Sequence, residues 1–205
     1  MYVPDPFRQD DREAALRLVA GASFGLLAVG LEAAHVPFVL DRERQALQCH
    51  VARANPIWRQ ALGAPVLAVF SGPHAYVSPD WYENTAQVPT WNFLAVHVSG
   101  TASRLPEEAL EAHLRALVAQ EEARLAKAPW TPERMDAGAL TALRRGIVGI
   151  EIPLERVEAK WKLSQNRGPA DRRSVRTALE RQGGENNLAV AALMADNEKE
   201  PAHDR

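Results

Sequence analysis

Short apolar segments that follow one another without a helix between them constrain the fold of this chain most. Residues 23–30 and 33–40 have the pattern of two strands joined by a short turn, and residues 46–51 alternate apolar and polar side chains with the period of a half-buried strand. Residues 148–154 alternate in the same way. Strands joined by short turns pair antiparallel, whereas a doubly wound parallel sheet needs a helix between successive strands. The pattern therefore predicts an antiparallel α+β barrel.

Further elements follow from capping residues and from apolar periodicity. Two more strands are predicted at residues 65–72 and 92–105, with a long loop over residues 73–89 between them. A chain of 205 residues suits one domain, so we expect a single domain over residues 1–196 and a polar tail over residues 197–205. Helices are predicted where a cap or a first-turn proline precedes an apolar face, at residues 11–20, 55–62, 107–127, 131–145, 171–182 and 187–195.

Composition argues against some classes of function. The 24 Lys and Arg residues nearly balance the 26 Asp and Glu residues, and the resulting formal net charge of -2 disfavours direct DNA binding. The single cysteine, Cys49, cannot form an intramolecular disulfide. The sequence shows neither a signal-peptide pattern nor an apolar stretch long enough to span a membrane. We therefore expect a cytoplasmic protein without a membrane partner.

The first candidate site residues lie at the end of the strand over residues 46–51. His50 emerges at this strand end, Arg53 follows, and Asn55 stands before a proline in the pattern of a helix start. Free N–H groups at a helix start and the planar fork of an arginine are groups that bind phosphate. The alternative is that Asn55 only caps the helix and Arg53 is a solvated surface charge.

The predicted loop over residues 73–89 carries the second group of candidates, in which aromatic rings alternate with hydrogen-bonding side chains. These residues are His74, Tyr76, Ser78, Trp81, Tyr82 and Asn84. Rings can stack on a planar cofactor while hydroxyl and amide groups read its edges. The alternative is that Trp81 and Tyr82 anchor a lid or a subunit interface.

A third group lies in the polar stretch over residues 160–167, which has neither strand nor helix periodicity. Its members can give charge and hydrogen bonds to a phosphate or to a carbonyl-rich ring edge. The alternative is a solvated basic surface. The members are Lys160, Lys162, Ser164, Gln165, Asn166 and Arg167. No Walker-type or G-x-G-x-x-G loop accompanies them. Metal binding is disfavoured because the histidines lack ligand spacing, and hydrolase chemistry because no serine lies in a nucleophile elbow. No catalytic residue is assigned.

Taken in order along the chain, these segments resemble the FMN-binding negative transcriptional regulator family, the PaiB-like proteins. The resemblance implies a split β-barrel with flanking helices, related to the pyridoxamine-phosphate oxidases. It also implies a homodimer with FMN in the cleft between the subunits. The matching segments are His50–Pro56, Gly72–Tyr82, Val88–Asn92 and Lys160–Arg167, with further likeness at Met1–Pro4 and His35–Phe38.

The residue patterns and the resemblance together predict a cofactor site. Arg53 is expected to be the principal phosphate ligand, and residues 50–55 are expected to lie near residues 162–166. The aromatic segment from Tyr76 to Trp91 is expected in the dimer interface. The predicted FMN-binding residues are His50, Arg53, Asn55, Tyr76, Ser78, Trp91, Asn92, Lys162, Ser164, Gln165 and Asn166.

Two classes of function stay open at this point. The first is a flavin-binding regulator that acts on transcription indirectly, because the sequence has no recognisable helix-turn-helix. The second is an FMN-dependent oxidoreductase that acts on a small molecule. A fold shared by oxidases, reductases and regulators does not decide between them.

Overall fold

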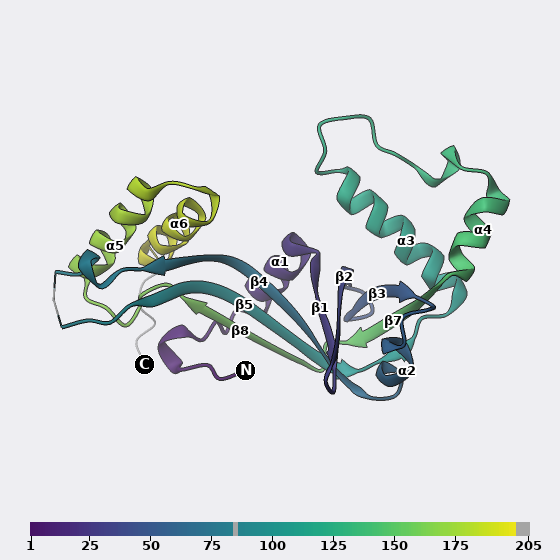
Figure 1. Cartoon of the computed structure of the whole chain (residues 1–205), viewed down its shortest axis with the longest axis horizontal. Coiled ribbons are helices and arrows are strands. Elements are labelled where there is room, and N and C mark those ends of the chain that lie inside the picture. The colour runs from purple at the N-terminus through teal and green to yellow at the C-terminus, as the bar shows by residue number, and fades with distance from the viewer. Residues whose placement is uncertain (84–85, 200–205) are drawn as a thin grey trace. The chain divides into compact units, whose positions relative to one another are not determined.

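Eight strands form one sheet in the computed structural model, which describes residues 1–83 and 86–199 (Figure 1). The strand order is β6-β7-β3-β2-β1-β4-β5-β8. The pairs β1–β2, β1–β4, β2–β3, β3–β7 and β6–β7 are antiparallel, which confirms the predicted fold class. The strands are β1 (Phe24–Val29), β2 (Glu32–Asp41), β3 (Ala46–Ala52), β4 (Pro65–Val77), β5 (Thr90–Thr101), β6 (Ser103–Arg104), β7 (Ile147–Pro153) and β8 (Arg156–Lys162).

Helices accompany the strands in irregular order, as the sequence predicts for an α+β chain. The α-helices of the described residues are α1 (Arg12–Ala22), α2 (Ile57–Ala61), α3 (Glu107–Glu122), α4 (Ala137–Arg145), α5 (Pro169–Gln182) and α6 (Glu185–Lys199). The same part of the chain contains the 3-10 turns η1 (Asp5–Phe7), η2 (Pro79–Trp81) and η3 (Pro132–Arg134). Helix α6 runs past the predicted start of the polar tail, and residues 200–205 lie outside the described residues.

The hairpin of β1 and β2 shows how local sequence sets register. Val29 pairs with Glu32, and Gly30 in the turn has a φ of +55°, a conformation that favours glycine. In β3, Leu47, Cys49 and Val51 are buried as predicted and His50 on the opposite face is half-buried, but Gln48 on that same face is buried, where its amide donates to Asp41 and Glu151. The sequence pattern therefore predicts both the strands and the core face of this region.

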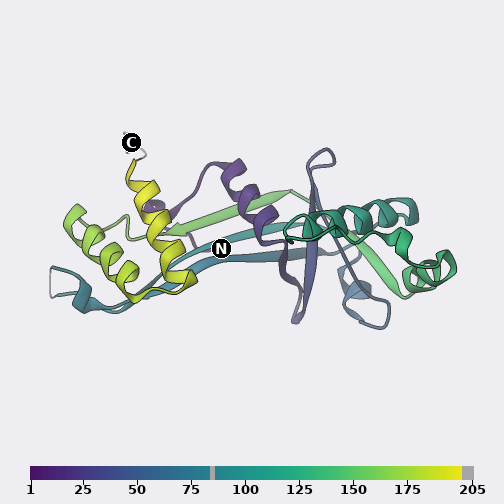
Figure 2. The same cartoon turned by 90° about the horizontal axis from the view of Figure 1, so that it is seen from above.

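Contacts divide the chain into two compact units, each with its own core. The β3 unit comprises residues 13–70 and 97–157, and the β8 unit comprises residues 1–12, 71–96 and 158–205. The single domain expected from the sequence stays a prediction. Large buried side chains of the β3 unit are Leu16, Leu27, Phe38, Leu47, Phe70, Ile150 and Ile152. In the β8 unit, α5 and α6 lie side by side (Figures 1 and 2) and bury Val175, Leu179, Val190 and Met194.

Two segments predicted to be irregular are strands. β4 continues to Val77, so His74 and Tyr76 belong to a strand and not to a loop. The pairing of β4 with β1 covers residues 67–69, so Pro73 lies beyond it, where its missing N–H removes no bond to β1. β8 includes Lys160 and Lys162, whose polar side chains obscure the strand period. The predicted loop residue Asn84 lies outside the described residues.

Two predicted helix boundaries are also wrong. Helix α3 ends at Glu122, before the predicted residue 127, and the Glu122 carboxylate accepts the Trp130 N–H at 2.6 Å. The predicted helix over residues 131–145 divides into η3 and α4. Asp136 caps α4 by accepting the Ala139 N–H at 3.0 Å, so the cap lies five residues after the predicted one.

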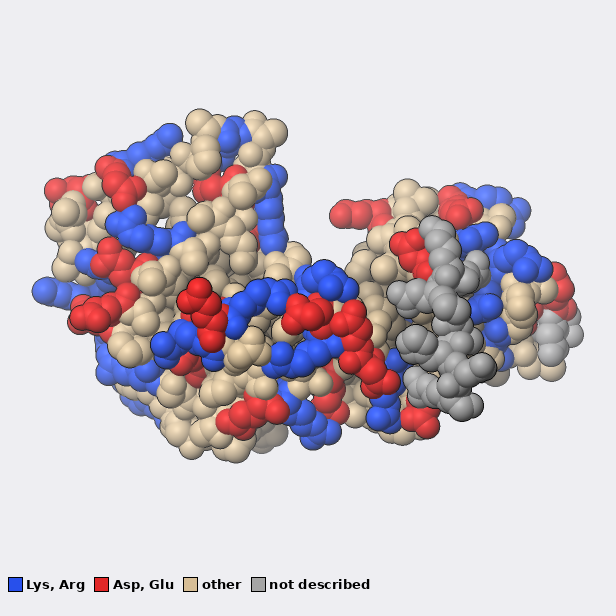
Figure 3. All heavy atoms as spheres, turned by 180° about the vertical axis from the view of Figure 1, so that it is seen from behind, with Lys and Arg blue, Asp and Glu red and all other residues tan. Residues whose placement is uncertain are grey.

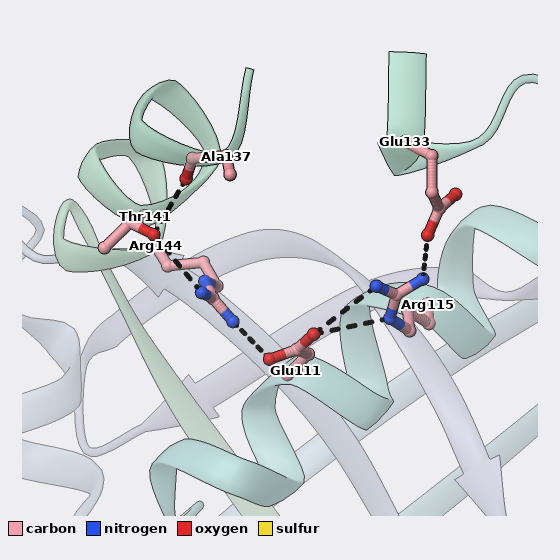
Figure 4. Close-up of polar contacts among 6 residues, drawn as sticks. All are labelled: Glu111, Arg115, Glu133, Ala137, Thr141 and Arg144. Carbon is pink, nitrogen blue, oxygen red and sulfur yellow. Dashed lines mark hydrogen bonds and ion pairs between the residues drawn. The ribbon is translucent and has the colours of Figure 1, made fainter. Parts of the chain in front are cut away.

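A chain of ion pairs connects α3, η3 and α4 on the β3 unit (Figure 4). Glu111 on α3 accepts from Arg144 on α4 and, at 3.4 Å, from Arg115. Arg115 also donates to Glu133 on η3 at 2.6 Å. These contacts hold the exposed segment between the two helices, and they lower the pKa of Glu133 to about 2, chiefly through the Arg115 hydrogen bond.

Candidate functional site

His50 sits at a contact between the sheet and a helix of the β3 unit. Its Nδ1 lies 3.1 Å from Nε2 of His113, a buried residue of α3, and the two rings meet edge to face at 5.3 Å. Burial lowers the pKa of His50, and burial followed by the charge of His50 lowers the pKa of His113 to about 4. Both imidazoles are therefore neutral near pH 7, where each offers one N–H donor.

The guanidinium of Arg53 donates hydrogen bonds to two backbone carbonyls at and just after the end of α4. Its Nε donates to the Arg145 carbonyl at 2.7 Å, and its Nη2 donates to the Ile147 carbonyl at 3.0 Å. The Arg145 carbonyl is one of those that the C-terminus of α4 leaves unpaired, whereas Ile147 is the first residue of β7. Arg53 thus has a structural role that neither of the two predicted alternatives included, and its remaining N–H groups are the ones that a phosphate can use.

Pro56 is the N-cap residue of α2, and the side chain of the preceding Asn55 supplies the capping contact that the sequence predicts. The Asn55 side-chain oxygen accepts the Ile57 N–H at 3.0 Å. Helix α2 is only five residues long, however, so the dipole and the free N–H groups expected at its start are those of little more than one turn. The only cationic group of residues 50–56 that an anion could use is therefore the guanidinium of Arg53, through the N–H groups that the two carbonyls leave unused.

Three exposed rings form a cluster on the β8 unit, here called the ring cluster, of His74, Tyr76 and Trp91. The Tyr76 and Trp91 rings meet edge to face at 5.8 Å, and the His74 ring lies 6.1 Å from that of Trp91. In β4, His74 and Tyr76 alternate with buried residues and share one face of the strand. Tyr76 is 44% and Trp91 52% exposed, so this face offers aromatic surface to a ligand or a partner.

Two lysines of β8 lie among aromatic side chains of the same unit. Nζ of Lys160 is 5.4 Å from the Phe93 ring centre, and Nζ of Lys162 is 6.0 Å from that of Phe7. Lys162 also donates to the hydroxyl of Thr90. Partial burial, followed by the charges of Lys160 and Arg167, lowers the pKa of Lys162. An anion beside Lys162 would stabilise its charged form and offset these effects on its pKa.

Several predicted ligands are used within the protein itself. Asn92 and Ser164 are both buried and hydrogen-bond to each other, with the Asn92 amide nitrogen 3.0 Å from the Ser164 hydroxyl. Gln165 accepts the Leu163 N–H and closes the turn after β8. The Ser78 hydroxyl accepts the Asp80 N–H at 3.3 Å and begins η2. The hydrogen-bonding groups of these four predicted residues are therefore used within the chain, at least in part.

The predicted residues are divided between the two units. His50, Arg53 and Asn55 belong to the β3 unit, and the other eight, including the exposed Asn166, belong to the β8 unit. The proximity of residues 50–55 to residues 162–166 stays a prediction. His113 is not among the predicted residues, although its spacing of three residues from buried Leu110 indicates a core position on α3.

Residues 1–83 and 86–199 contain neither a metal-binding cluster nor a membrane-spanning helix. No three or more His, Cys, Asp and Glu side chains group in a way that can hold a metal ion. No helix in this range combines the length and the apolar character needed to cross a bilayer.

Solved structures place the architecture in a known class. A flavocytochrome from Azotobacter vinelandii superimposes with a TM-score of 0.55 at 14% identity, covering 80% of this chain and 71% of the other. An FAD and heme binding protein from Mycobacterium smegmatis gives a TM-score of 0.54 at 14% identity, covering 76% and 73%. At this identity the likeness concerns the fold alone, and it identifies an antiparallel split barrel.

Sequence comparison identifies the family. The model described as "Putative FMN-binding domain" matches residues 1–156. The protease synthase and sporulation protein PAI 2 of Bacillus subtilis is 33% identical over 206 residues, covering 97% of this chain and 99% of the relative. The chain belongs to this FMN-binding, PaiB-like family, which confirms the resemblance stated above, and FMN is the cofactor of the family.

Proposed function

We propose that the chain is an FMN-binding regulatory protein of the cytoplasm that acts as a homodimer and affects transcription indirectly. The observation that carries the proposal is the exposed ring cluster in a chain of an FMN-binding family. FMN combines a planar aromatic ring system with a phosphate of about two negative charges at neutral pH. The described residues fit both parts, because exposed rings and cationic side chains occur in the predicted segments.

The chemistry of the side chains suggests a role for each group of residues. Tyr76 and Trp91 present flat surfaces suited to the flavin ring, and edge-to-face pairs of this kind also hold their rings in fixed orientations. Lys162 and the remaining donors of Arg53 are suited to the phosphate. His50, neutral near pH 7, is suited to a hydrogen bond with an uncharged acceptor of the cofactor. When bound, FMN supplies a redox-active ring to the protein.

A second copy of the chain is the partner that we propose for the ring cluster. Large rings with about half of their surface exposed are enriched at interface centres. A homodimer in which this face meets the cofactor and the partner would bury them. Light scattering at micromolar concentration should give the mass of a dimer, and a monomer would contradict this part of the proposal.

An indirect effect on transcription fits the charge distribution. The formal net charge is -2, and Lys and Arg are intermixed with Asp and Glu on the face drawn in Figure 3. In a helix-turn-helix, the second helix enters the major groove by its N-terminal end. Helix α6, the second helix of the α5–α6 pair, begins with Glu185. The regulatory role itself is drawn from the family resemblance and from the Bacillus subtilis relative, whose name is protease synthase and sporulation protein PAI 2.

The proposal is tested by fluorescence titration of FMN against the wild type and Trp91→Ala. Loss of one stacked ring is expected to weaken binding by about threefold to tenfold, which corresponds to an aromatic contact of about 0.5–1.5 kcal/mol. Phe24→Ala removes another exposed ring, at the start of β1 in the β3 unit, and serves as the matched control. Equal FMN affinity in Trp91→Ala and the wild type would contradict the assignment of the ring cluster.

Turnover separates the regulatory proposal from the oxidoreductase alternative. NADH or NADPH is added to the FMN complex without oxygen, and flavin absorbance is followed before and after air is admitted. A flavin that stays oxidised on the time scale of minutes supports the regulatory module. Rapid bleaching that recovers in air would favour the oxidoreductase.

A further inference from the structure

The contact between His50 and His113 is a hydrogen bond between two ring nitrogens, and its geometry bears on the tautomer of each imidazole. The separation of 3.1 Å between His50 Nδ1 and His113 Nε2 requires that one hydrogen lies between these atoms. The other ring nitrogen of His113, Nδ1, is buried and has no hydrogen-bond partner in the part of the chain that the structure describes. Which nitrogen carries the hydrogen on each ring can therefore be worked out.

The fold brings α3 close enough for this contact through a glycine. His50 of β3 pairs with Gly149 of β7 in the antiparallel ladder. A Cβ on Gly149 would lie 2.8 Å from the Leu105 Cβ and 3.0 Å from Leu110 Cδ1, so a larger residue would push the start of α3 away. His113 lies one turn after Leu110 and faces the sheet with it. The position of His113 against His50 is thus built into the strand pairing and the helix packing.

Two arrangements of hydrogens satisfy the shared bond, and they differ in what they leave unpaired. If His50 donates from Nδ1, His113 must carry its own hydrogen on Nδ1, which becomes a buried N–H without an acceptor. If His113 donates from Nε2, its Nδ1 is left as a bare lone pair. Buried N–H groups without partners are rarer than incompletely paired acceptors, so the second arrangement is favoured.

We infer that His113 is a positioning residue that donates from Nε2 to Nδ1 of His50 and so holds His50 in its Nε2–H tautomer, as a hydrogen-bond donor toward FMN. This inference rests on the proposed function for the contact between His50 and the cofactor. His50 is half-buried and His113 is fully buried, so His50 is the one of the two that can meet a ligand. The lowered pKa of both groups keeps the pair neutral near pH 7.

The tautomer assignment is tested without cofactor by two-bond ¹H–¹⁵N NMR of the imidazole rings, which distinguishes protonated from unprotonated nitrogens. The six histidines are assigned from single His→Gln variants. The wild type should show the Nε2–H form for both His50 and His113. An Nδ1–H form of His50 in the folded wild type would overturn the inference, whatever the variants show.

Variants of His113 test whether this residue sets the tautomer. His113→Gln keeps an amide donor near the position of Nε2 and should preserve the Nε2–H form of His50, whereas His113→Leu should give a mixture of tautomers. His113→Leu should also weaken FMN binding in proportion to the fraction of His50 left in the other tautomer, about twofold for an equal mixture, and His113→Gln should restore it. His35→Gln, at an exposed histidine of β2, is the matched control. An unchanged His50 tautomer in folded His113→Leu would overturn the positioning role.

The two readouts separate failure of this inference from failure of the proposed function. If His113→Leu changes the tautomer while His50→Ala binds FMN as tightly as the wild type, the His50 contact to the cofactor is wrong and the donor role toward FMN falls with it. If His50→Ala weakens FMN binding while His113→Leu changes neither the tautomer nor the affinity, the positioning inference alone is wrong.

Discussion

Replacing Arg53 with alanine should weaken two properties of the protein, its stability and its affinity for FMN. The guanidinium donates to the carbonyls of Arg145 and Ile147 at 2.7 and 3.0 Å, and the substitution removes both bonds. The side chain is exposed, so solvent replaces part of what is lost. We expect a loss of about 1–2 kcal/mol in the free energy of unfolding, or about 2–8 °C in Tm for a chain of this size.

The effect on FMN follows from the N–H groups of Arg53 that do not donate to the Arg145 and Ile147 carbonyls. One charge-assisted hydrogen bond to phosphate contributes about 1.5–3 kcal/mol, so Arg53→Ala should weaken FMN binding by one to two powers of ten. Riboflavin, which lacks the phosphate, should bind the variant and the wild type alike. Equal weakening of FMN and riboflavin would refute the phosphate role of Arg53.

Thermal unfolding and fluorescence titration measure the two effects separately. Arg59→Ala is the matched control. Arg59 carries the same charge six residues after Arg53, and its guanidinium lies over the Trp58 ring. Binding is measured well below the Tm of each variant, so that lost affinity is not lost fold. A Tm for Arg53→Ala equal to that of Arg59→Ala would refute the reasoning from the Arg145 and Ile147 carbonyls.

Three further predictions follow from buried and paired groups. The Cys49 thiol, whose pKa burial raises to about 12, should resist a thiol reagent at pH 8 in the folded protein and react once urea unfolds it; reaction at the same rate in both states would contradict its burial. Glu133, whose pKa falls from 4.5 to about 2 beside Arg115, should contribute stability that is complete above pH 4.5 and is lost as the pH falls toward 2. Glu133→Gln should reduce that pH dependence, and an unchanged acid unfolding curve would count against the ion pair. Asn92→Ala should lower the free energy of unfolding by about 1–3 kcal/mol because it leaves the buried Ser164 hydroxyl unpaired, and a double-mutant cycle with Ser164→Ala should show coupling between the two sites.

The sequence predicts β3 and β7 of the β3 unit well because apolar and polar residues alternate along them. β3 and β7 lie within one or two residues of their predicted bounds. β8 and the second half of β4 were missed because Pro73 and the polar residues around Lys160 conceal the strand period, and pairing with neighbours decides these segments.

The candidate site was predictable by residue type but not by contact. The segments around His50 and Trp91 could be selected because polar and aromatic residues gather there. The bond from Arg53 to the end of α4 and the pairing of His50 with His113 join residues far apart in the sequence. Such contacts depend on tertiary packing, which cannot be read from the spacing of residues within one segment.

The most direct test of the account is the absorption spectrum of the purified protein, combined with mass analysis of the released cofactor. The account predicts flavin bands and a released molecule with the mass of FMN, either as isolated or after incubation with FMN and gel filtration. Protein that is folded and dimeric but keeps no flavin after such incubation would contradict it.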